Sequence, residues 1–452
     1  MALSPKKSPS AEAFAELKGP MTREEARVES SRCLYCYDAP CVTACPTHID
    51  VPRFIRQIAA ADPLGSAETI LEANALGHSC ARVCPVEVLC EGACVYHDWQ
   101  EKPIQIARLQ RHATDAVYAT GELPFSPGKD NGKRVAIIGA GPAGASCAAY
   151  LRRLGFAVAI FEKRKLPGGL NTYGVAEYKM SQPTAIEEMK FLFQLGCDVV
   201  TGKEIGKDVP AADLLSDFDA VFVGIGLAET RSLNIPGEDL AGVVDALSFI
   251  ERVKAKGGKG VPRSAHTVVI GGGNTAIDAT TQSARSGAAK VTLAYRRGPE
   301  DMSAYDFEIA LAKADGAAII TRAVPKRILG KKTVSGVEFA DKTKISCDRV
   351  IKAIGQTKHF ALAKALGLAQ REDGRLAVDA GTLQTSKPNV FAGGDAVNGG
   401  KEVVNAAADG KRAAWGIFQA LFPGRPAPLD NAYWISTIDG RTVAPITPRS
   451  HA

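Results

Sequence analysis

The cysteines constrain this chain more than any other feature, because eight of its eleven cysteines lie between residues 33 and 94. They form two runs, Cys33-x2-Cys36-x4-Cys41-x3-Cys45-Pro46 and Cys80-x3-Cys84-Pro85-x4-Cys90-x3-Cys94. Clustered thiolates of this kind are typical ligands of iron–sulfur clusters or of zinc. The segment is therefore expected to hold metal centres.

Disulfides and zinc are the other uses of such a segment. A disulfide framework fits poorly, because the cysteines occupy one part of a long chain that has nucleotide-binding motifs and no secretory signal. A zinc interpretation would place Cys33, Cys36, Cys41 and Cys45 in one closed tetrahedral site. The Cys-Pro endings and the flavin motif further along the chain favour iron–sulfur clusters over zinc.

Composition sets the class of protein. A chain of 452 residues should divide into roughly two to four domains. With 46% hydrophobic and 23% charged residues it should be folded throughout. A net charge of +6 without a helix dense in Lys and Arg argues against nucleic acid. No apolar leader segment and no apolar run of about 18 residues is present, so a cytoplasmic protein without a membrane span is expected.

The first domain is predicted to be α-helical and to cover residues 1–125. Val51–Ala60 and Ala67–Ala73 carry apolar residues with helical spacing, and Thr22 with Glu25 forms a capping-box pattern. No alternating strand pattern appears between the cysteines, and the turn-rich segment 121–128 reads as a linker.

Two βαβ units follow the linker. The first comprises Val135–Ile138, Ala143–Leu154 and Val158–Phe161, and the second comprises Thr267–Ile270, Ala276–Ser286 and Val291–Tyr295. The segment 389–395 then reads as another strand that runs into a Gly-rich turn. The predicted fold is multidomain, with an α-helical iron–sulfur domain followed by two Rossmann-like α/β dinucleotide-binding domains. An FAD domain over 130–230 and 381–425 would be interrupted by an NAD(P) domain over 231–380, and residues 426–452 would form a C-terminal tail.

The first βαβ unit carries the sequence Gly139-Ala140-Gly141-Pro142-Ala143-Gly144 between strand and helix. The glycines permit a tight turn and close backbone approach, and the helix N-terminus can receive a pyrophosphate. Glu162, at the end of the next strand, is placed to accept hydrogen bonds from a ribose. Gly168-Gly169 just beyond it matches a flavin-enzyme pattern, so we assign this site to FAD. The alternative is a Gly-rich turn that binds nothing.

The second unit carries Gly271-Gly272-Gly273-Asn274-Thr275-Ala276, and its second strand ends in Arg296-Arg297. A cationic pair at that position can bind the 2′-phosphate of NADPH. This pair therefore favours NADPH over NADH, and the alternative is that the two arginines are a solvated strand end.

A third segment, Gly393-Gly394-Asp395 with Val403 ahead of an Ala-rich helix, resembles the second flavin contact of flavoproteins with two dinucleotide domains. Asp395 would then hydrogen-bond the ribityl or pyrophosphate end. The cysteines outside the first domain form no Cys-x-x-Cys, which disfavours a disulfide exchange like that of thioredoxin reductase. Electrons from the flavin would instead enter the cysteine domain.

The chain resembles the family that contains dihydropyrimidine dehydrogenase and the small subunit of bacterial glutamate synthase, over residues 25 to 420. The resemblance is nearest to the flavin-and-NAD(P) subunit of the two-subunit bacterial dihydropyrimidine dehydrogenase. It rests on the stretches Ala39–Cys41, Ala44–Asp50, Asn74–Gly77, Cys80–Pro85, Leu89–Cys94, Lys102–Ile104 and Leu109–Arg111.

The resemblance implies two [4Fe–4S] clusters with crossed ligation. One would be held by Cys33, Cys36, Cys41 and Cys94, and the other by Cys45, Cys84, Cys90 and Gln110. Cys80 would be a buried non-ligand. Gln110 favours the pyrimidine branch, because the glutamate synthase branch typically has Glu there. The alternative for Gln110 is an exposed helical residue.

The resemblance also implies which residues lie near the other cofactors. Those expected near the flavin are Gly169, Leu170, Lys179, Ile205, Gly394, Asp395 and Val403. Those expected near the nicotinamide coenzyme are Asn274, Thr275, Ala276, Ile277, Arg296, Arg297, Ala353, Ile354 and Gly355. This chain has Ser303 where the mammalian enzyme has a further basic residue. This difference weakens the prediction of NADPH, so the expected coenzyme is NADH or NADPH.

The function implied is that of an electron-input subunit in a hetero-oligomer, with no catalytic side chain of its own. NAD(P)H would reduce FAD, and the clusters would pass electrons to a partner subunit that contains FMN and iron–sulfur clusters and reduces the 5,6 double bond of uracil or thymine. No room for an FMN barrel of roughly 250 residues remains after residue 425, and the tail, with Tyr433 and Trp434, is a candidate partner interface.

Three alternatives remain: a glutamate synthase small subunit, a stand-alone NAD(P)H:acceptor reductase, and a zinc-stapled nucleotide-binding regulatory module without redox turnover.

Overall fold

The computed structural model describes residues 11–258, 261–427, 429, 437–438 and 441–442. The chain forms two compact units. The larger consists of Lys18–Asn171, Pro183–Leu227 and Lys358–Ala452, and the smaller of Met1–Leu17, Thr172–Gln182 and Ala228–Thr357. Both units are therefore assembled from segments that are distant in the sequence.

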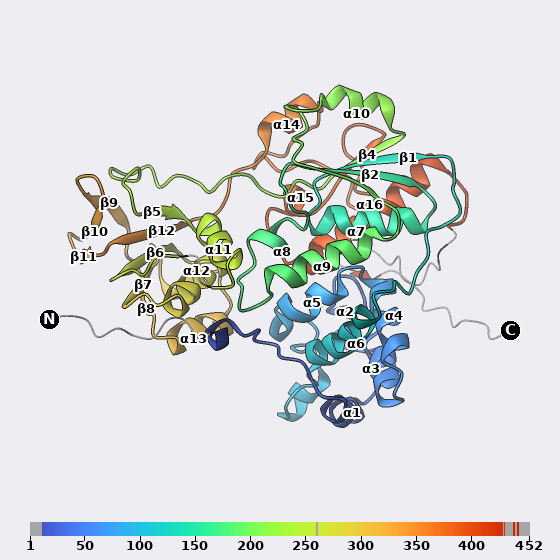
Figure 1. Ribbon diagram of the computed structural model, residues 1–452, viewed down its shortest axis with the longest axis horizontal. Helices are drawn as coiled ribbons and strands as arrows, with labels where there is room; N and C mark the ends of the chain where they lie inside the picture. Colours follow the sequence, from blue (N-terminus) through green and yellow to red (C-terminus); the bar gives the residue numbers. More distant parts are fainter. Residues whose placement is uncertain (1–10, 259–260, 428, 430–436, 439–440, 443–452) are drawn as a thin grey trace. The chain divides into compact units, whose positions relative to one another are not determined.

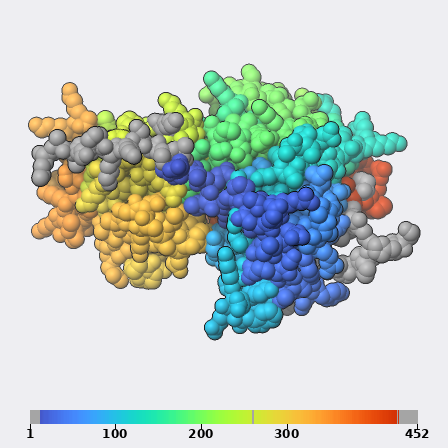
Figure 2. Space-filling model, turned by 60° about the horizontal axis from the view of Figure 1, so that its bottom comes forward, coloured from blue at the N-terminus to red at the C-terminus, as the bar shows by residue number. Residues whose placement is uncertain are grey.

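The first part of the larger unit is helical, as predicted. Its α-helices are α1 (Arg23–Ser31), α2 (Pro40–Thr43), α3 (Val51–Ala59), α4 (Pro63–Ala73), α5 (Gly77–Val83) and α6 (Ile106–Thr120) (Figure 1). The capping box of Thr22 and Glu25 starts α1, while Asp50 and Asp62 cap α3 and α4. In the space-filling view the atoms of this helical region, coloured from blue to cyan, form one continuous block (Figure 2).

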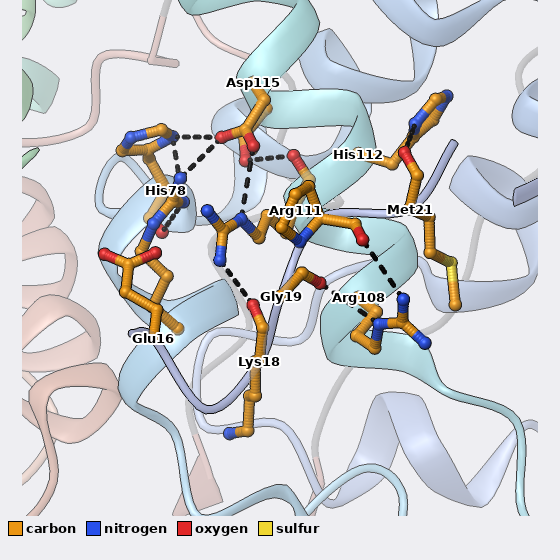
Figure 3. Close-up of polar contacts among 12 residues, drawn as sticks. Glu16, Lys18, Gly19, Met21, His78, Arg108, Arg111, His112 and Asp115 are labelled. Carbon is orange, nitrogen blue, oxygen red and sulfur yellow. Dashed lines mark hydrogen bonds and ion pairs between the residues drawn. The ribbon is translucent and has the colours of Figure 1, made fainter. Parts of the chain in front are cut away.

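The segment that leads into α1 is held against α6 by cationic side chains (Figure 3). Arg108 donates to the carbonyl of Gly19 over 3.1 Å, and Arg111 donates to the carbonyl of Lys18. One helical turn further along α6, Asp115 forms an ion pair with Arg82 of α5 at 2.6 Å. These contacts fix α5, which carries Cys80, against α6, which carries Gln110.

The second part of the larger unit is a parallel sheet of five strands in the order β13-β4-β1-β2-β3. Its strands are β1 (Arg134–Ile138), β2 (Ala157–Glu162), β3 (Asp198–Thr201), β4 (Ala220–Val223) and β13 (Val390–Ala392). In the register of the sheet, Ala136 of β1 pairs with Ala159 on one side and with Val221 on the other. β4 is buried along its whole length, as expected for a parallel strand covered on both faces.

Strand β13 follows β4 in space although more than 160 residues of the chain separate them. The smaller unit is built largely from the sequence between these two strands. The prediction that the FAD domain is interrupted by the NAD(P) domain is thus confirmed. The helices of this part are α7 (Pro142–Arg153), α8 (Leu170–Tyr173), α9 (Gln182–Phe193), α10 (Ala211–Asp217), α14 (Phe360–Ala365), α15 (Asp395–Asn398) and α16 (Val403–Leu421), where α8 and α9 extend into the segment 172–182 of the smaller unit.

The smaller unit contains a second parallel sheet of five strands, in the order β5-β12-β6-β7-β8, and an antiparallel sheet in the order β11-β10-β9. The elements are β5 (Val243–Asp245), α11 (Ala246–Lys254), β6 (Thr267–Gly271), α12 (Asn274–Arg285), β7 (Val291–Ala294), α13 (Asp306–Ala314), β8 (Ala318–Ile320), β9 (Pro325–Gly330), β10 (Val334–Phe339), β11 (Lys344–Ser346) and β12 (Arg349–Ala353). Both predicted Rossmann-like folds are present (Figure 1).

Two observations concern the rest of the chain. Strands β14 (Thr437–Ile438) and β15 (Arg441–Thr442) pair in the tail, while Tyr433 and Trp434 lie outside the described residues. Among the described residues, none of the helices combines the length and the apolar character that crossing a bilayer requires.

Gly410 of α16 allows close packing against α7. A methyl group at this position would lie 2.3 Å from the carbonyl oxygen of Ala143 and 2.8 Å from the backbone nitrogen of Cys147. At an exposed position inside a helix, replacing Gly with Ala stabilises the helix by about 1 kcal/mol. Here the steric conflict is with backbone atoms that have no rotamer to change.

We predict that Gly410→Ala lowers the free energy of unfolding by about 1–3 kcal/mol, as overpacking typically does. The measurement is thermal unfolding followed by circular dichroism, with Gln419→Ala at an exposed position of α16 as the matched control. A Gly410→Ala protein as stable as this control would contradict the inferred contact.

Candidate functional site

The first cysteine group surrounds a pocket in the helical region. Four thiols lie in the wall of this pocket, those of Cys33, Cys36, Cys41 and Cys94, around a space of about 370 Å³ that is partly open to solvent. Most other lining side chains are apolar, for example Val51, Ile55 and Ile106. Thiols that are up to 61 positions apart in the sequence therefore meet at one apolar pocket.

The thiols of this group affect one another electrostatically. Burial, together with the neighbouring thiols of Cys33, Cys94 and Cys36, raises the pKa of Cys41 to about 12. Burial also raises the pKa of Cys33, to which Cys36 and Cys94 again contribute. The neutral forms of Cys33 and Cys41 are thus favoured until a cationic centre offsets the repulsion that their ionised forms would meet.

The second cysteine group consists of Cys45, Cys84 and Cys90. Burial, followed by the charges of Cys45, Glu91 and Cys84, raises the pKa of Cys90 well above its ordinary value. The pKa of Cys84 is raised first by a hydrogen bond with Cys80 and then by burial. The Lys18 ammonium donates a hydrogen bond to the carbonyl of Cys84, which anchors this loop. Cys80 is buried beside Cys84.

Gln110 lies on α6 and is 7% exposed. The alternative of an exposed helical residue is therefore wrong. Its Nε2 donates a hydrogen bond of 2.7 Å to the carbonyl oxygen of Gly77. This bond fixes the orientation of the side-chain amide. The Oε1 atom of the amide, which is the atom able to act as a ligand, is not used by this bond.

The donor set fits iron–sulfur clusters better than a single ion. In the part of the chain that the structure describes, no three His, Cys, Asp or Glu side chains converge on a point where one metal ion could sit. A zinc site would need four ligands about 2.3 Å from one point. Cys94, rather than Cys45, shares the pocket with Cys33, Cys36 and Cys41, so the closed zinc site is not formed. All eleven cysteines, each within the described ranges, are free of disulfides.

The first Gly-rich turn forms a cradle at the carboxyl end of β1. Gly139 has φ of +97°, and a Cβ there would lie 2.6 Å from the carbonyl oxygen of Gly224, so only glycine fits. Pro142 begins α7, whose N-cap residue Gly141 provides no capping side chain, so the N–H groups of Ala143 and Gly144 face a ligand position. The carboxylate of Glu162 accepts hydrogen bonds from the backbone nitrogens of Ala140 and Arg164, at 2.9 and 2.8 Å.

Two further segments meet this cradle. Gly169, with φ of +54°, approaches so closely that a Cβ would lie 2.8 Å from the Cα of Gly141. A Cβ at Gly394 would lie 3.0 Å from the Cβ of Ala143. Leu170 is partly exposed next to Gly169, and Val403 is the first residue of α16. The structure thus brings these segments together around an uncapped helix N-terminus, a shape that fits the pyrophosphate of FAD.

Asp395 and Asp409 form a carboxylate pair at the end of β13. Burial raises the pKa of Asp395, and the charge of Asp409 adds to this effect. Asp395 accepts a hydrogen bond of 3.1 Å from the backbone of Lys401, and Asp409 accepts one of 3.0 Å from that of Gly394. Asp409 was not predicted, because nothing in a helical Ala-rich segment indicates that this residue turns back to the Gly-rich loop.

A buried polar network connects α5 to α8, the short helix that follows Gly169. Glu188 of α9 accepts hydrogen bonds from the backbone and the hydroxyl of Ser79, and Asn171 donates to the same hydroxyl over 3.0 Å. The Oδ1 of Asn171 is buried and has no hydrogen-bond partner among the described residues, so it is available to a bound group. The sequence analysis missed this network, although Glu188 lies on the apolar face of α9, where a carboxylate is unusual.

In the smaller unit, the second fingerprint lies where β6 and β12 end side by side. Gly271 pairs with Ala353, and a Cβ at Gly271 would lie 2.3 Å from the carbonyl oxygen of Ala353. Ile354 and Gly355 continue from this point. The structure therefore brings together the two predicted coenzyme segments, and α12 begins there after the N-cap residue Gly273, which offers no capping side chain.

The other predicted coenzyme residues differ in their surroundings. Asn274 accepts a hydrogen bond of 3.1 Å from the backbone of Tyr305, Thr275 is exposed, and Ala276 and Ile277 are buried in the core. Arg296 and Arg297 are both exposed after β7, and Arg297 donates to the hydroxyl of Tyr295 over 2.9 Å. The hydroxyl of Ser303 would lie 3.3 Å from a Cβ at Gly273, so it faces the fingerprint.

Two residues expected near the flavin, Lys179 and Ile205, lie in different units of the structure. Lys179 belongs to the smaller unit, where its ammonium pairs with Asp278 at 2.8 Å and with Glu308 at 2.6 Å. Burial alone would lower the pKa of Lys179, but these two carboxylates raise it above its ordinary value. Ile205 packs into the apolar core of the larger unit beside β1 and β4.

Glu188 leads to a pH-dependent prediction. Burial raises its pKa from 4.5 to about 7. The folded state therefore keeps a proton that the unfolded state loses, and the stability that this group contributes falls as pH rises from 4.5 to 7. We predict that Glu188→Gln removes up to about 3 kcal/mol of this pH dependence. Unfolding measured at pH 5 and pH 8 tests this, with the exposed neighbour variant Glu187→Gln as control. An equal pH dependence in both variants would refute the assignment.

Comparison with known proteins agrees with this geometry. A family model described as dihydropyrimidine dehydrogenase domain II, 4Fe-4S cluster, matches residues 10–122. A second, described as pyridine nucleotide-disulphide oxidoreductase, matches residues 133–410. The chain is also similar in fold to thioredoxin reductase from T. acidophilum, with a TM-score of 0.52 and 24% identity over 64% of this chain and 98% of that one.

Curated relatives match over most of their length. The NAD-dependent dihydropyrimidine dehydrogenase subunit PreT of Escherichia coli (strain K12) is 36% identical over 90% of this chain and 97% of its own. The glutamate synthase [NADPH] small chain of the same organism is 34% identical over 90% and 94%, and that of Halomonas elongata is 32% identical over 92% and 96%. The chain therefore belongs to the family of pyridine-nucleotide oxidoreductases with an N-terminal 4Fe-4S domain that includes the dihydropyrimidine dehydrogenase subunit PreT and the glutamate synthase small chains.

Proposed function

We propose that this chain is the electron-input subunit of a dihydropyrimidine dehydrogenase. The observation that carries the proposal is the grouping of the cysteines into two sets within the unit that also contains the FAD cradle. A partner subunit of the PreA type, with FMN and iron–sulfur clusters, would reduce uracil or thymine to the 5,6-dihydropyrimidine. The reaction of the complex is then an oxidation or reduction of a CH–CH bond with NAD(P).

The chain's residues would hold two [4Fe–4S] clusters, FAD and NAD(P)H. Cys33, Cys36, Cys41 and Cys94 would ligate one cluster, and Cys45, Cys84, Cys90 and Gln110 the other. When bound, the flavin would accept hydride from the nicotinamide, and the clusters would carry single electrons onward. The apolar wall of the first pocket would surround one cluster, and the uncapped N-terminus of α7 would bind the pyrophosphate.

Gln110 supports the pyrimidine branch. It is buried, and the bond from its Nε2 to Gly77 orients the neutral amide oxygen as a possible ligand. Three thiolates and a neutral amide carry one negative charge less than three thiolates and a carboxylate, as a Glu at this position would supply. The relative PreT is described as NAD-dependent, and the exposed Arg296 and Arg297 leave room for either coenzyme.

The decisive experiment is an anaerobic assay of the native complex. NAD(P)H oxidation that depends on uracil, in a complex with an FMN-bearing subunit, is the expected result. Oxidation that depends only on 2-oxoglutarate plus glutamine would instead make the chain a glutamate synthase small subunit. Oxidation with neither, but with an artificial acceptor and without a partner, would make it a stand-alone reductase.

Iron content tests the second cysteine group separately. We predict that Cys84→Ala loses about half of the iron bound per chain, because one of two equal clusters cannot assemble without a thiolate ligand. Cys80→Ala is the matched control, since Cys80 is buried beside Cys84 but is no proposed ligand. Equal iron loss in the two variants would contradict the ligand assignment, and colourless wild-type protein would contradict the clusters altogether.

A further inference from the structure

Lys411 of α16 is a buried cation whose side chain reaches the helical region of the larger unit. Its side chain is 5% exposed, and its ammonium donates hydrogen bonds to the carbonyl oxygens of Thr47 at 3.0 Å and Ala73 at 2.8 Å. The ring of Tyr150 lies 5.9 Å from the ammonium. A residue near the C-terminal end of the FAD-type domain is thus inserted between α4 and the turn that carries Cys45.

No carboxylate neutralises this cation. Within the ranges that the structure describes, Lys411 forms no ion pair. The pKa of Lys411 is lowered to about 7, chiefly by burial, and the charge of Cys45 is the largest of the influences that oppose this lowering. Glu72 raises it as well, though less than Cys45, while Arg412 and Arg153 lower it. A buried ammonium is expensive unless it faces a negative group.

Cys45 is in a position to provide that negative group. Its sulfur lies 3.3 Å from the hydroxyl of Thr47, the same residue whose carbonyl accepts from Lys411. The second cysteine group becomes anionic only when its thiols ligate metal. The ammonium and this group are therefore electrostatically complementary, and both are shielded from solvent, where screening would weaken their attraction.

We propose that Lys411 is a positioning residue whose ammonium serves as the counter-charge of the centre held by Cys45, Cys84 and Cys90, and raises the reduction potential of that centre. This inference rests on the proposed function in so far as it requires a cluster there. A fixed positive charge stabilises the more negative, reduced state over the oxidised one. Lys411 also lies on α16, the helix that begins beside the FAD cradle. Its charge would therefore favour electron transfer from the flavin side onto this cluster.

The test is a potentiometric titration of the holoprotein followed by electron paramagnetic resonance. Lys411→Met should lower the midpoint potential of one cluster and leave the other unchanged. We expect a change of at least tenfold in the equilibrium constant for one-electron reduction, which is 59 mV for a one-electron couple. Lys411→Arg, which keeps the charge, should restore most of the wild-type potential. Arg412→Gln removes the same charge from the next residue, which is 22% exposed, and should shift neither cluster.

Three results would overturn the inference. They are unchanged potentials in Lys411→Met, an equal shift in Lys411→Met and Lys411→Arg, and a shift of similar size in Arg412→Gln. Lys411→Gln, whose amide can still donate to Thr47 and Ala73, replaces the Met variant if that variant does not fold. If the neutral variants lose iron, the iron content of Lys411→Arg decides. Retained iron in Lys411→Arg supports the role of Lys411 as a counter-charge, and loss of iron in Lys411→Arg refutes that role. A wild-type protein without cluster signals would refute the proposed function instead.

Discussion

The contact between α7 and α16 at Gly410 is the interaction on which the larger unit depends. It has no room for a Cβ, because the backbone of α7 lies within 2.3 Å of where that atom would be. The contact returns the C-terminal segment to the first fingerprint, where Gly394 approaches Ala143. The next residue, Lys411, leaves the same helix in a different direction and reaches Thr47 and Ala73. One short stretch of helix therefore connects the dinucleotide cradle with the cysteine-bearing turns.

Burial is the second common theme of the larger unit. Burial moves the pKa toward the neutral form for a thiol, a carboxylate and an ammonium of this unit, those of Cys41, Glu188 and Lys411. Such groups destabilise a fold that lacks compensating charge. They are compatible with a stable protein when bound cofactors provide that charge. The apolar surroundings that make the free thiols unfavourable as ions also strengthen electrostatic interactions once a charged centre is present.

Much of this architecture could be predicted from the sequence, because its signals are local. The capping box of Thr22 and the Gly-rich turn after β1 each depend on residues within a few positions of one another. Spacing alone grouped Cys33, Cys36 and Cys41 with Cys45, whereas the pocket contains Cys94. That choice depends on where the segment around Cys94 folds back onto the first cysteine run, and only the family resemblance anticipated it. Glu188, Asp409 and Lys411 could not be predicted, because their roles depend on partners in other segments, at sequence separations of 109, 15 and 364 residues.

The position of β13 has a consequence for how the protein is made. Its partner strand β4 leaves the ribosome long before it, and the whole of β5 to β12 is synthesised in between. The nascent sheet must therefore keep an open edge at β4, a site prone to wrong pairing, while a second sheet folds. Contacts of such long sequence separation form slowly. Flavin capture is then a late event that waits for residues 390–421, and only a chain translated to that point can close its own cradle.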